Sequence, residues 1–327
     1  MRIAVTGSIA TDHLATFPGR FADQLMPDQL DRVSLSFLVD DLEVQHGGVG
    51  ANIAFGLGVL GLTPYLVGAV GTDFDTYRIW LKEHGVNTDQ VLVTDMAQTA
   101  RFMCTTDLDQ NQIASFYAGA MAEAATIDLA RVAERAGGLD LVLVSPNAPD
   151  AMLRHTEQCR ELGLPFAADP SQQLARLTRT EARQLVTGAR WLFTNAYEAE
   201  LLRELTGWDR EEILSRVGAW ITTRSTEGVI VEAVGDTPRA FPAVPPSAIV
   251  DPTGVGDAFR AGFLAGTSWG LPDHVAIALG CAVATRALET MGSQQYTAPP
   301  ADLLARIAET YGAPVAALLA PHLERRL

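Results

Sequence analysis

A short glycine-rich stretch, residues 251–257, combines a tight turn with a carboxylate. It reads Asp-Pro-Thr-Gly-Val-Gly-Asp, and apolar residues at helical spacing follow it. Gly254 and Gly256 allow a turn that points consecutive backbone N–H groups into one concavity. A helix that begins at about Gly256 adds its unpaired N–H groups and its dipole to the same point. The stretch therefore predicts an anion-binding nest with a carboxylate, Asp257, at its edge.

The chemistry of Asp257 depends on what the nest holds. As a general base, Asp257 would take a proton from a hydroxyl group. The backbone N–H groups of Gly254, Val255, Gly256 and Asp257 would then stabilise a phosphoryl group in transfer. A carboxylate near a helix N-terminus is also a common helix stabiliser, and this stretch alone leaves that interpretation open.

Three further segments place polar side chains beside glycines or at a helix start. Gly7–Asp12 leaves the first expected strand at its carboxyl end, where open α/β sheets bind ligands and where Asp12 could accept hydrogen bonds from a vicinal diol. In Gly47–Asn52, the glycines let backbone approach a ligand, and the amide of Asn52 can donate and accept. Asn195–Glu198 follows a strand and opens a helix. Each of these segments alone also fits a solvated loop or a helix cap.

Strands and helices alternate along most of the chain. This alternation predicts βαβ units and a mostly parallel sheet covered by helices on both faces. The expected strands are 2–7, 64–70, 139–145, 165–168, 190–194 and 220–223, with a β-rich segment over 229–244. The expected helices are 49–60, 76–84, 128–136, 149–161, 179–187, 197–205, 209–218, 256–265, 273–290, 300–311 and a last piece to about 325.

Two regions, about 13–46 and 91–118, break this alternation. They contain strand-like runs at 33–38, 42–45, 91–94, 99–106 and 112–117. We expect them to form a small separate sheet, most simply a lid over the strand ends. No repeat or linker divides the chain, so the expectation is one domain, residues 1–327, with these two lid segments inserted.

Composition restricts the ligands and the compartment. A net charge of −15 argues against a nucleic-acid or anionic-membrane partner, both of which need a basic face. The only lysine, Lys82, precedes a glutamate, so no GxxxxGK[ST] loop exists and a nucleotide would be held by backbone N–H groups, arginine and metal. No apolar run approaches the ~20 residues of a membrane span. Three scattered cysteines, Cys104, Cys159 and Cys281, favour a reduced, cytoplasmic protein.

The stretch 251–263 resembles the C-terminal signature of the ribokinase-type (PfkB) family of sugar and nucleoside kinases. Segments 47–52 and 195–198 resemble two further motifs of that family, in the same order, although Ala196 stands where an acidic residue is more usual. The resemblance implies a three-layer α/β/α ribokinase-like fold with a central mostly parallel sheet and a small β-sheet lid. It implies ATP as phosphate donor, an anion hole at Gly254–Asp257, and Mg²⁺ near Glu198, held through water.

The same resemblance implies K⁺ activation through the loop at Asp251, and a homodimer formed by pairing lid edges. An exposed lid strand would otherwise be an open edge that invites association.

Several segments are similar to the mycobacterial-type adenosine kinases: GSIATDH, Leu35-Ser36-Phe37, ARFMCTTD, QIASFYAGAM and DPSQQLARL. This similarity implies phosphorylation of adenosine at its 5′-hydroxyl to give AMP, a purine-salvage reaction. In that group, Phe102 and Phe116 would sandwich the purine by stacking, and the amides of Gln172 and Gln173 would read its edge. The further contacts implied are Ser8, Asp12, Ser36, Gly48 and Asn52 for the nucleoside, and Arg176, Asn195, Thr223, Ser225 and Gly256 for ATP.

Other functions fit the same motifs. The chain could phosphorylate ribose, fructose, guanosine or inosine, or it could be a non-catalytic nucleoside-binding protein. The paired phenylalanines favour a substrate that carries a base, and the intact nest with its carboxylate favours catalysis. A hydride-transferring enzyme is disfavoured, since no GxGxxG follows the first strand.

Overall fold

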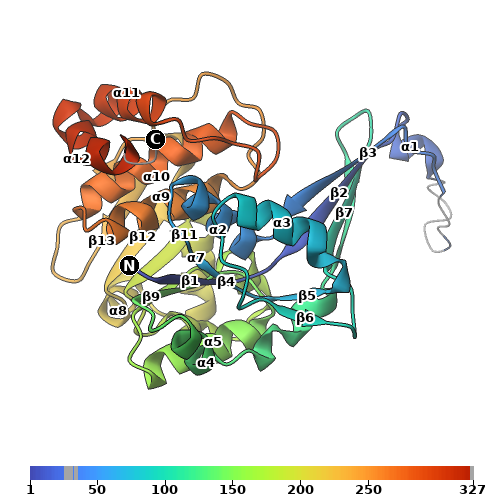
Figure 1. The fold of residues 1–327 in the computed structure, drawn as a ribbon. Coiled ribbons are helices and arrows are strands. Elements are labelled where there is room, and N and C mark those ends of the chain that lie inside the picture. The colour runs from blue at the N-terminus through green and yellow to red at the C-terminus, as the bar shows by residue number, and fades with distance from the viewer. Residues whose placement is uncertain (26–31, 33–35, 325–327) are drawn as a thin grey trace.

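A central sheet of eight strands lies between two layers of helices in the computed structural model, which describes residues 1–25, 32 and 36–324 (Figure 1). The strand order is β14-β13-β12-β11-β10-β9-β1-β4. The strands from β12 to β4 in this order run parallel, and β13 and β14 extend one edge antiparallel. Their bounds are β1 Ile3–Thr6, β4 Tyr65–Val67, β9 Leu141–Val144, β10 Phe166–Ala168, β11 Trp191–Asn195, β12 Ala219–Thr223, β13 Val229–Glu232 and β14 Arg239–Phe241. This is the fold class that the alternation predicts.

The helices cover both faces because the central strands are apolar on both sides. In β1 and β9 every residue is buried, and alternate residues enter two different cores. One core is shared with α2 Val49–Val59, α3 Asp75–Glu83, α9 Val255–Ser268, α10 Asp273–Leu288, α11 Pro300–Tyr311 and α12 Ala313–Leu323. The other core is shared with α4 Leu129–Arg135, α5 Pro149–Glu161, α6 Arg179–Val186, α7 Ala196–Thr206 and α8 Arg210–Arg216.

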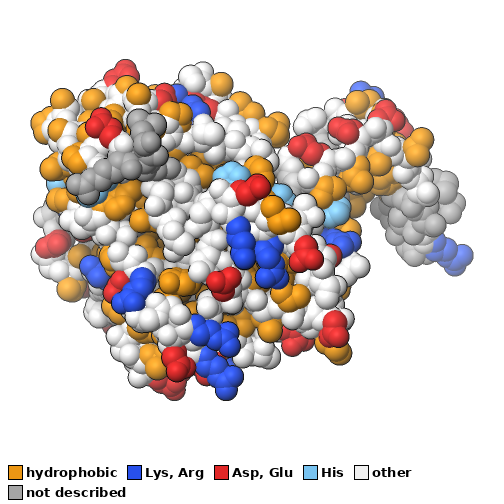
Figure 2. Space-filling model, viewed as in Figure 1, with side chains coloured by type: hydrophobic (Ala, Val, Ile, Leu, Met, Phe, Trp, Pro, Cys, Tyr) orange, Lys and Arg blue, Asp and Glu red, His pale blue; other side chains and the backbone are white. Residues whose placement is uncertain are grey.

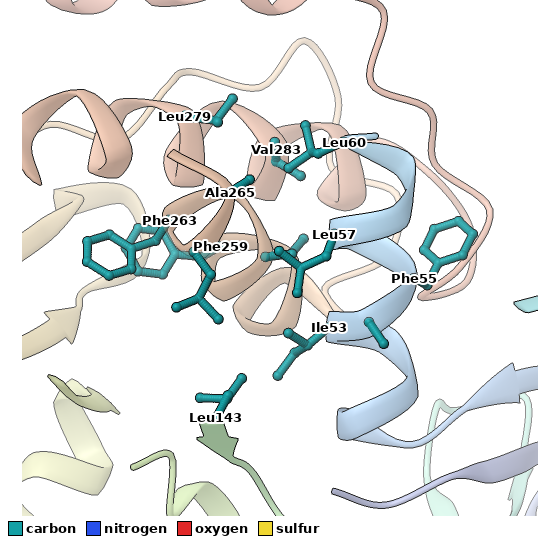
Figure 3. Close-up of a cluster of buried hydrophobic side chains, with 14 of the residues drawn as sticks. Ile53, Phe55, Leu57, Leu60, Leu143, Phe259, Phe263, Ala265, Leu279 and Val283 are labelled. Atoms are coloured by element: carbon teal, nitrogen blue, oxygen red, sulfur yellow. The ribbon is translucent and has the colours of Figure 1, made fainter. Parts of the chain in front are cut away.

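Helix α9 is held by close packing on both sides, which fixes the position of its N-terminus. Ile53 and Leu57 of α2 face Phe259 of α9 across the first core (Figure 3). On the other side, a Cβ added to Gly262 would lie 2.7 Å from Cα of Gly280 in α10. The small residues therefore let α9 and α10 approach closely, and bulkier ones would displace the start of α9.

A second sheet of four strands projects from the body as an arm (Figures 1 and 2). Its order is β3-β2-β7-β8, with β2 Ala10–Thr16, β3 Asp41–Gly47, β7 Ala100–Thr106 and β8 Gln112–Tyr117. A short helix, α1 Phe21–Gln24, lies near its outer end. We call this the lid sheet. It is the small separate sheet that the two irregular regions predict.

The strands of the lid sheet differ in detail from the expectation. Strand β2 was not expected, and it pairs with both β3 and β7. Of the strand expected over 33–38, residues 33–35 lie outside the described residues and 36–38 form no strand. The segment expected at 91–94 forms β6 (Leu92–Thr94), which pairs with β5 (Ala69–Gly71) in a separate two-stranded sheet. The expectation placed β6 in the lid because periodicity reports a strand but not its partner.

None of the described helices combines the length and apolar character that spanning a bilayer requires.

Candidate active site

Two cavities meet at the N-terminus of α9. The first, about 510 Å³, lies between the lid sheet and the body, and we call it the lid cavity. The second, about 430 Å³, lies between α9, α10 and the antiparallel edge of the sheet, and we call it the edge cavity. Gly254 and Asp257 line the lid cavity, whereas Val255 and Gly256 line the edge cavity. The glycine turn therefore forms the boundary between the lid cavity and the edge cavity.

The backbone turns sharply at Gly254, directly before α9. Gly254 has a φ of +75° and precedes the first residue of α9. The preceding loop is fastened by Asp251, whose two carboxylate oxygens accept hydrogen bonds from the backbone N–H groups of Thr253 (2.8 Å) and Gly292 (2.9 Å). A Cβ at Gly254 would lie 2.7 Å from that of Ser293. The position therefore requires glycine both for its backbone conformation and for space.

Asp257 lies in the wall of the lid cavity with protein on its other sides. Burial raises its pKa to about 7; the hydrogen bond from Asn52 and the charge of Arg260 oppose this rise, while Asp169 and Glu198 add to it. Nδ2 of Asn52 donates to Oδ2 of Asp257 at 2.9 Å. A carboxylate whose pKa lies near neutral pH suits a general base.

A buried ion pair that the sequence analysis missed lies beneath the nest. Arg260, one turn after Asp257, contacts the carboxylate of Asp169 at 2.6 Å and donates to the backbone carbonyl of Gly256 at 2.9 Å. Asp169 directly follows β10, so the pair joins α9 to the carboxyl end of that strand. Each residue lies in a segment that the sequence analysis singled out, but no sequence signal pairs them, because they are 91 residues apart.

The segment around Asp12 forms a second acidic position in the lid cavity. Burial raises the pKa of Asp12 to about 6, and the charge of Asp251 contributes to this rise. A Cβ at Gly47 would lie 2.5 Å from the Asp12 carboxylate, and Gly48 has a φ of +93°. Oγ of Ser8 accepts from the first N–H of α2, at 3.0 Å. The glycines thus leave room for a carboxylate beside exposed backbone, which can bind hydroxyl groups.

The two predicted phenylalanines lie directly opposite each other on neighbouring strands. In the register of the lid sheet, Asp12, Phe102 and Phe116 form one row across β2, β7 and β8, and all three line the lid cavity. Residues in one such row share a face of the sheet. The rings therefore form one apolar wall, so a flat ligand would lie against them rather than between them as a sandwich requires.

The opposite side of the lid cavity carries three predicted residues on one 3₁₀ segment, η4 (Ser171–Arg176). Gln173 is buried, and its Oε1 has no hydrogen-bond partner. Gln172 is exposed, and its Oε1 accepts from the hydroxyl of Ser171 at 2.7 Å. Arg176, predicted to contact ATP, is exposed and lines the lid cavity together with Gly254.

The edge cavity suits a flat apolar group with a polar rim. Thr223 and Ser225 lie at its mouth, where β12 ends and the chain turns back. Ser225 has a φ of +51°, unusual for a residue other than glycine. The remaining wall is mainly apolar and includes Val229, Val244, Ile249, Phe259 and Leu288. Both residues predicted from the sequence for this side, Thr223 and Ser225, thus share the cavity with Gly256.

Four predicted residues line neither cavity. Ser36 is exposed near the outer end of the lid sheet, where its neighbour Phe37 packs on Phe17 and Phe21. Asp251 fastens the nest loop, as described above. Asn195 and Glu198 form a capping box at the start of α7: Oδ1 of Asn195 accepts from the N–H of Glu198, and Oε2 of Glu198 accepts from that of Asn195.

The described residues contain no group of three or more His, Cys, Asp or Glu side chains arranged to hold a metal ion. Glu198 is buried, its Oε2 accepts from the N–H of Asn195 at 2.7 Å, and its Oε1 lies 3.2 Å from the hydroxyl of Ser171. Such a carboxylate can orient the water shell of Mg²⁺, which keeps several waters and binds mostly through phosphates. The donors present therefore fit a magnesium ion that enters with a nucleotide.

An open α/β sheet with two cavities that meet at a glycine turn beside a buried carboxylate is the arrangement expected of a phosphotransferase. The family model for "pfkB family carbohydrate kinase" matches residues 8–300. This match spans most of the chain, and the chain therefore belongs to the pfkB family of carbohydrate kinases.

Solved structures of the same fold support this membership. The chain is 34% identical to Burkholderia thailandensis nucleoside kinase in complex with inosine, with a TM-score of 0.82 over 95% of this chain and 98% of that chain. A structure of the same relative holds ADP and inosine (35% identity, TM-score 0.80, covering 95% and 96%). A nucleoside kinase of Methanocaldococcus jannaschii is 27% identical over 76% of this chain and 81% of its own length.

Proposed function

We propose that the protein is an adenosine kinase, which transfers the γ-phosphoryl group of ATP to the 5′-hydroxyl of adenosine to give AMP. The observation that carries this proposal is the position of the nest between the two cavities. A nucleoside in the lid cavity and a nucleotide in the edge cavity would meet at Gly254–Asp257. The Burkholderia thailandensis nucleoside kinase, whose structures hold inosine or ADP with inosine, shares this fold.

Each group then has a physical task. Asp257 takes the proton from the 5′-hydroxyl as that oxygen attacks the γ-phosphorus, which also releases ADP. The N–H groups of Gly254, Val255, Gly256 and Asp257 stabilise the charge on the transferring group. The ribose diol is bound by Asp12 and Asn52, with Ser8 and the backbone at Gly48 completing the contacts. Arg176 lies at the same cavity with its guanidinium exposed, and it would pair with the phosphates.

Adenosine is favoured over other nucleosides by the chemistry of Gln173. Its Oε1 is a buried acceptor that lacks a donor, and such a group is costly to leave unpaired. The 6-amino group of adenine would supply a donor at the purine edge, whereas inosine carries a carbonyl acceptor there and has its donor on the neighbouring N1. Phe102 and Phe116 would stack against the base. A free pentose would leave both the amide and the phenyl rings without a partner.

Two ions belong to the proposal. Mg²⁺ would neutralise the phosphates of ATP and be oriented through water by Glu198, with Asn195 holding that carboxylate in place. K⁺ would act through the loop at Asp251, whose conformation sets the nest. Turnover in K⁺ and in choline buffers tests the second ion directly.

We further propose that the four-stranded sheet closes over the substrate as a lid and that it pairs with a second copy to form a homodimer. The sheet face away from the cavity supports this, because Leu42, Val44, Met103 and Ile113 share that face in the strand register and are all exposed. Analytical ultracentrifugation tests it: Val44→Asp should convert a dimer to monomers, whereas Val234→Asp, an exposed valine of the body, should not. The free, buried cysteines are consistent with the proposed cytoplasmic location.

The test of the activity is ADP release from Mg-ATP with adenosine, inosine, guanosine, ribose and fructose. We expect adenosine to give the highest kcat/KM. Gln173→Leu should lower kcat/KM for adenosine by about tenfold, with a smaller change for inosine. Preference for a free sugar would refute the nucleoside assignment, and equal loss for adenosine and inosine would refute the role of Gln173.

A further inference from the structure

Gln294 lies behind the candidate base, in a network of hydrogen bonds that the sequence did not reveal. It is buried, as is its neighbour Ser293. Nε2 of Gln294 donates to Oδ1 of Asn52 at 2.8 Å, and the hydroxyl of Ser293 donates to the same oxygen at 3.1 Å. Nδ2 of Asn52 donates in turn to Asp257. Gln294 is therefore one side chain removed from the group that takes the proton.

Trp80, at the end of the network farthest from Asp257, determines which groups donate and which accept. Nε1 of Trp80 donates to Oε1 of Gln294 at 3.1 Å, and an indole N–H can only donate. The carboxamide oxygen of Gln294 must therefore face Trp80, which turns its NH₂ group toward Asn52. Since Oδ1 of Asn52 then accepts, its NH₂ group must face Asp257.

The same NH₂ group extends the network to the other side of the lid cavity. It also donates to the hydroxyl of Tyr77, which donates to the backbone carbonyl of Gly47 at 2.9 Å. Gly47 lies against the carboxylate of Asp12. One buried amide thus contacts both the segment that would bind the ribose and the asparagine that holds the base.

We propose that Gln294 is a positioning residue for phosphoryl transfer: by fixing the orientation of the Asn52 amide, it keeps a hydrogen-bond donor on Oδ2 of Asp257 and leaves Oδ1 for the substrate hydroxyl. This inference rests on the proposed function for its catalytic meaning. Its structural content, the orientation of Asn52, is independent of the substrate.

The effect on protonation follows from the groups around Asp257. A hydrogen bond donated by Asn52 favours the ionised carboxylate, so its loss raises the pKa of Asp257. The charged or titratable groups that also face Asp257 are Arg260 on the same helix, Asp169 after β10, Glu198 on α7 and Tyr296 near the C-terminus. A substitution at Gln294 leaves all four in place.

The experiment compares three substitutions. Gln294→Met keeps the length of the side chain but cannot donate to Asn52. Trp80→Phe keeps an aromatic ring but releases the Gln294 amide to rotate. Gln158→Met is the matched control, because Gln158 is another amide that bridges two segments, through Leu129 and Asp128, on the opposite helical layer. Should Gln294→Met fail to fold, Gln294→Leu removes the same donor without adding a charge near Asp257.

The readout that needs no turnover is the protonated-carboxyl band of Asp257, taken as the infrared difference between each protein and its Asp257→Asn counterpart across pH. We expect the transition to rise by about one pH unit in Gln294→Met, by less in Trp80→Phe, and to stay in place in Gln158→Met. The acid limb of kcat/KM for adenosine should move by the same amounts. A shift under about 0.3 unit in Gln294→Met, with only a loss of thermal stability, would overturn the proposal. A shifted band in Gln294→Met, when the wild type phosphorylates no nucleoside, would uphold the positioning role and reject the proposed function.

Discussion

Replacing Asp257 by Asn should make the protein more stable at alkaline pH while removing its activity. The raised pKa of Asp257, about 7 against an ordinary 3.8, means that the folded protein holds a proton that the unfolded chain releases. This contribution to stability is fully present below about pH 4 and is lost as the pH rises through 7. Ionised Asp257 therefore opposes folding at pH 8, and a neutral amide side chain does not.

The magnitude follows from the shift. About three pKa units correspond to about 4 kcal/mol, and the contact of the side chain with the open cavity reduces this to an effect on the order of 2 kcal/mol. The hydrogen bond from Nδ2 of Asn52 survives, because the carboxamide oxygen introduced by Asp257→Asn can still accept it. The substitution should nevertheless lower kcat by about 10²- to 10⁴-fold, since the proton acceptor is lost.

The assay is chemical unfolding of the wild type and Asp257→Asn at pH 5 and pH 8, beside kcat at pH 8. Asp95→Asn, at an exposed turn, is the control for substitution of a carboxylate as such. We expect Asp257→Asn to gain stability over the wild type at pH 8 and to gain much less at pH 5. Equal stability differences at both pH values, or a destabilised variant at pH 8, would refute the reasoning about burial.

Three further substitutions test other parts of the account. Gly254→Ala should lower kcat by at least about tenfold, because the φ of +75° and the contact with Ser293 both exclude a Cβ at this position. Gly270 is the control: it has the same φ but open space around it, so Gly270→Ala should lower stability without lowering kcat. Phe116→Ala should raise KM for adenosine, measured by ADP release, by about tenfold through loss of stacking. Ile113 lies on the opposite face of the same strand, so Ile113→Ala should leave KM unchanged. Leu57→Ala should cost about 2–5 kcal/mol in chemical unfolding because Leu57 is fully buried, and a loss under about 1 kcal/mol would show that the α2–α9 contact is not a rigid support.

The sequence predicts the parts of this protein that depend on local pattern. Strands such as β9, an uninterrupted apolar run, and helices such as α5 and α11 follow from periodicity and turn residues. The sharp turn before α9 follows from glycine spacing, because the backbone conformation at Gly254 is a local property. Ser8 follows the end of β1 and Asn52 lies in the first turn of α2, and the topology of a parallel sheet brings such ends together.

Local sequence pattern does not predict which distant strands or side chains contact each other. Strand β2 carries a mixture of polar and apolar residues, because one face is directed to a cavity and the other to solvent, so its alternation is weak. The partner of β6 depended on which strand lies nearby rather than on its own residues. Gln294 lies in no motif, and no local pattern pairs Arg260 with Asp169, since the partners are 242 and 91 residues apart in the chain.

The proposed function requires that a phosphoryl group pass from ATP in the edge cavity to a nucleoside in the lid cavity at Gly254–Asp257. Phosphorus NMR of wild-type protein with Mg-ATP and adenosine tests it most directly, with Asp257→Asn as the matched control. We expect 5′-AMP and ADP to appear in equal amounts with the wild type, and neither to accumulate with Asp257→Asn. Release of inorganic phosphate without AMP, or unchanged AMP formation by Asp257→Asn, would contradict it.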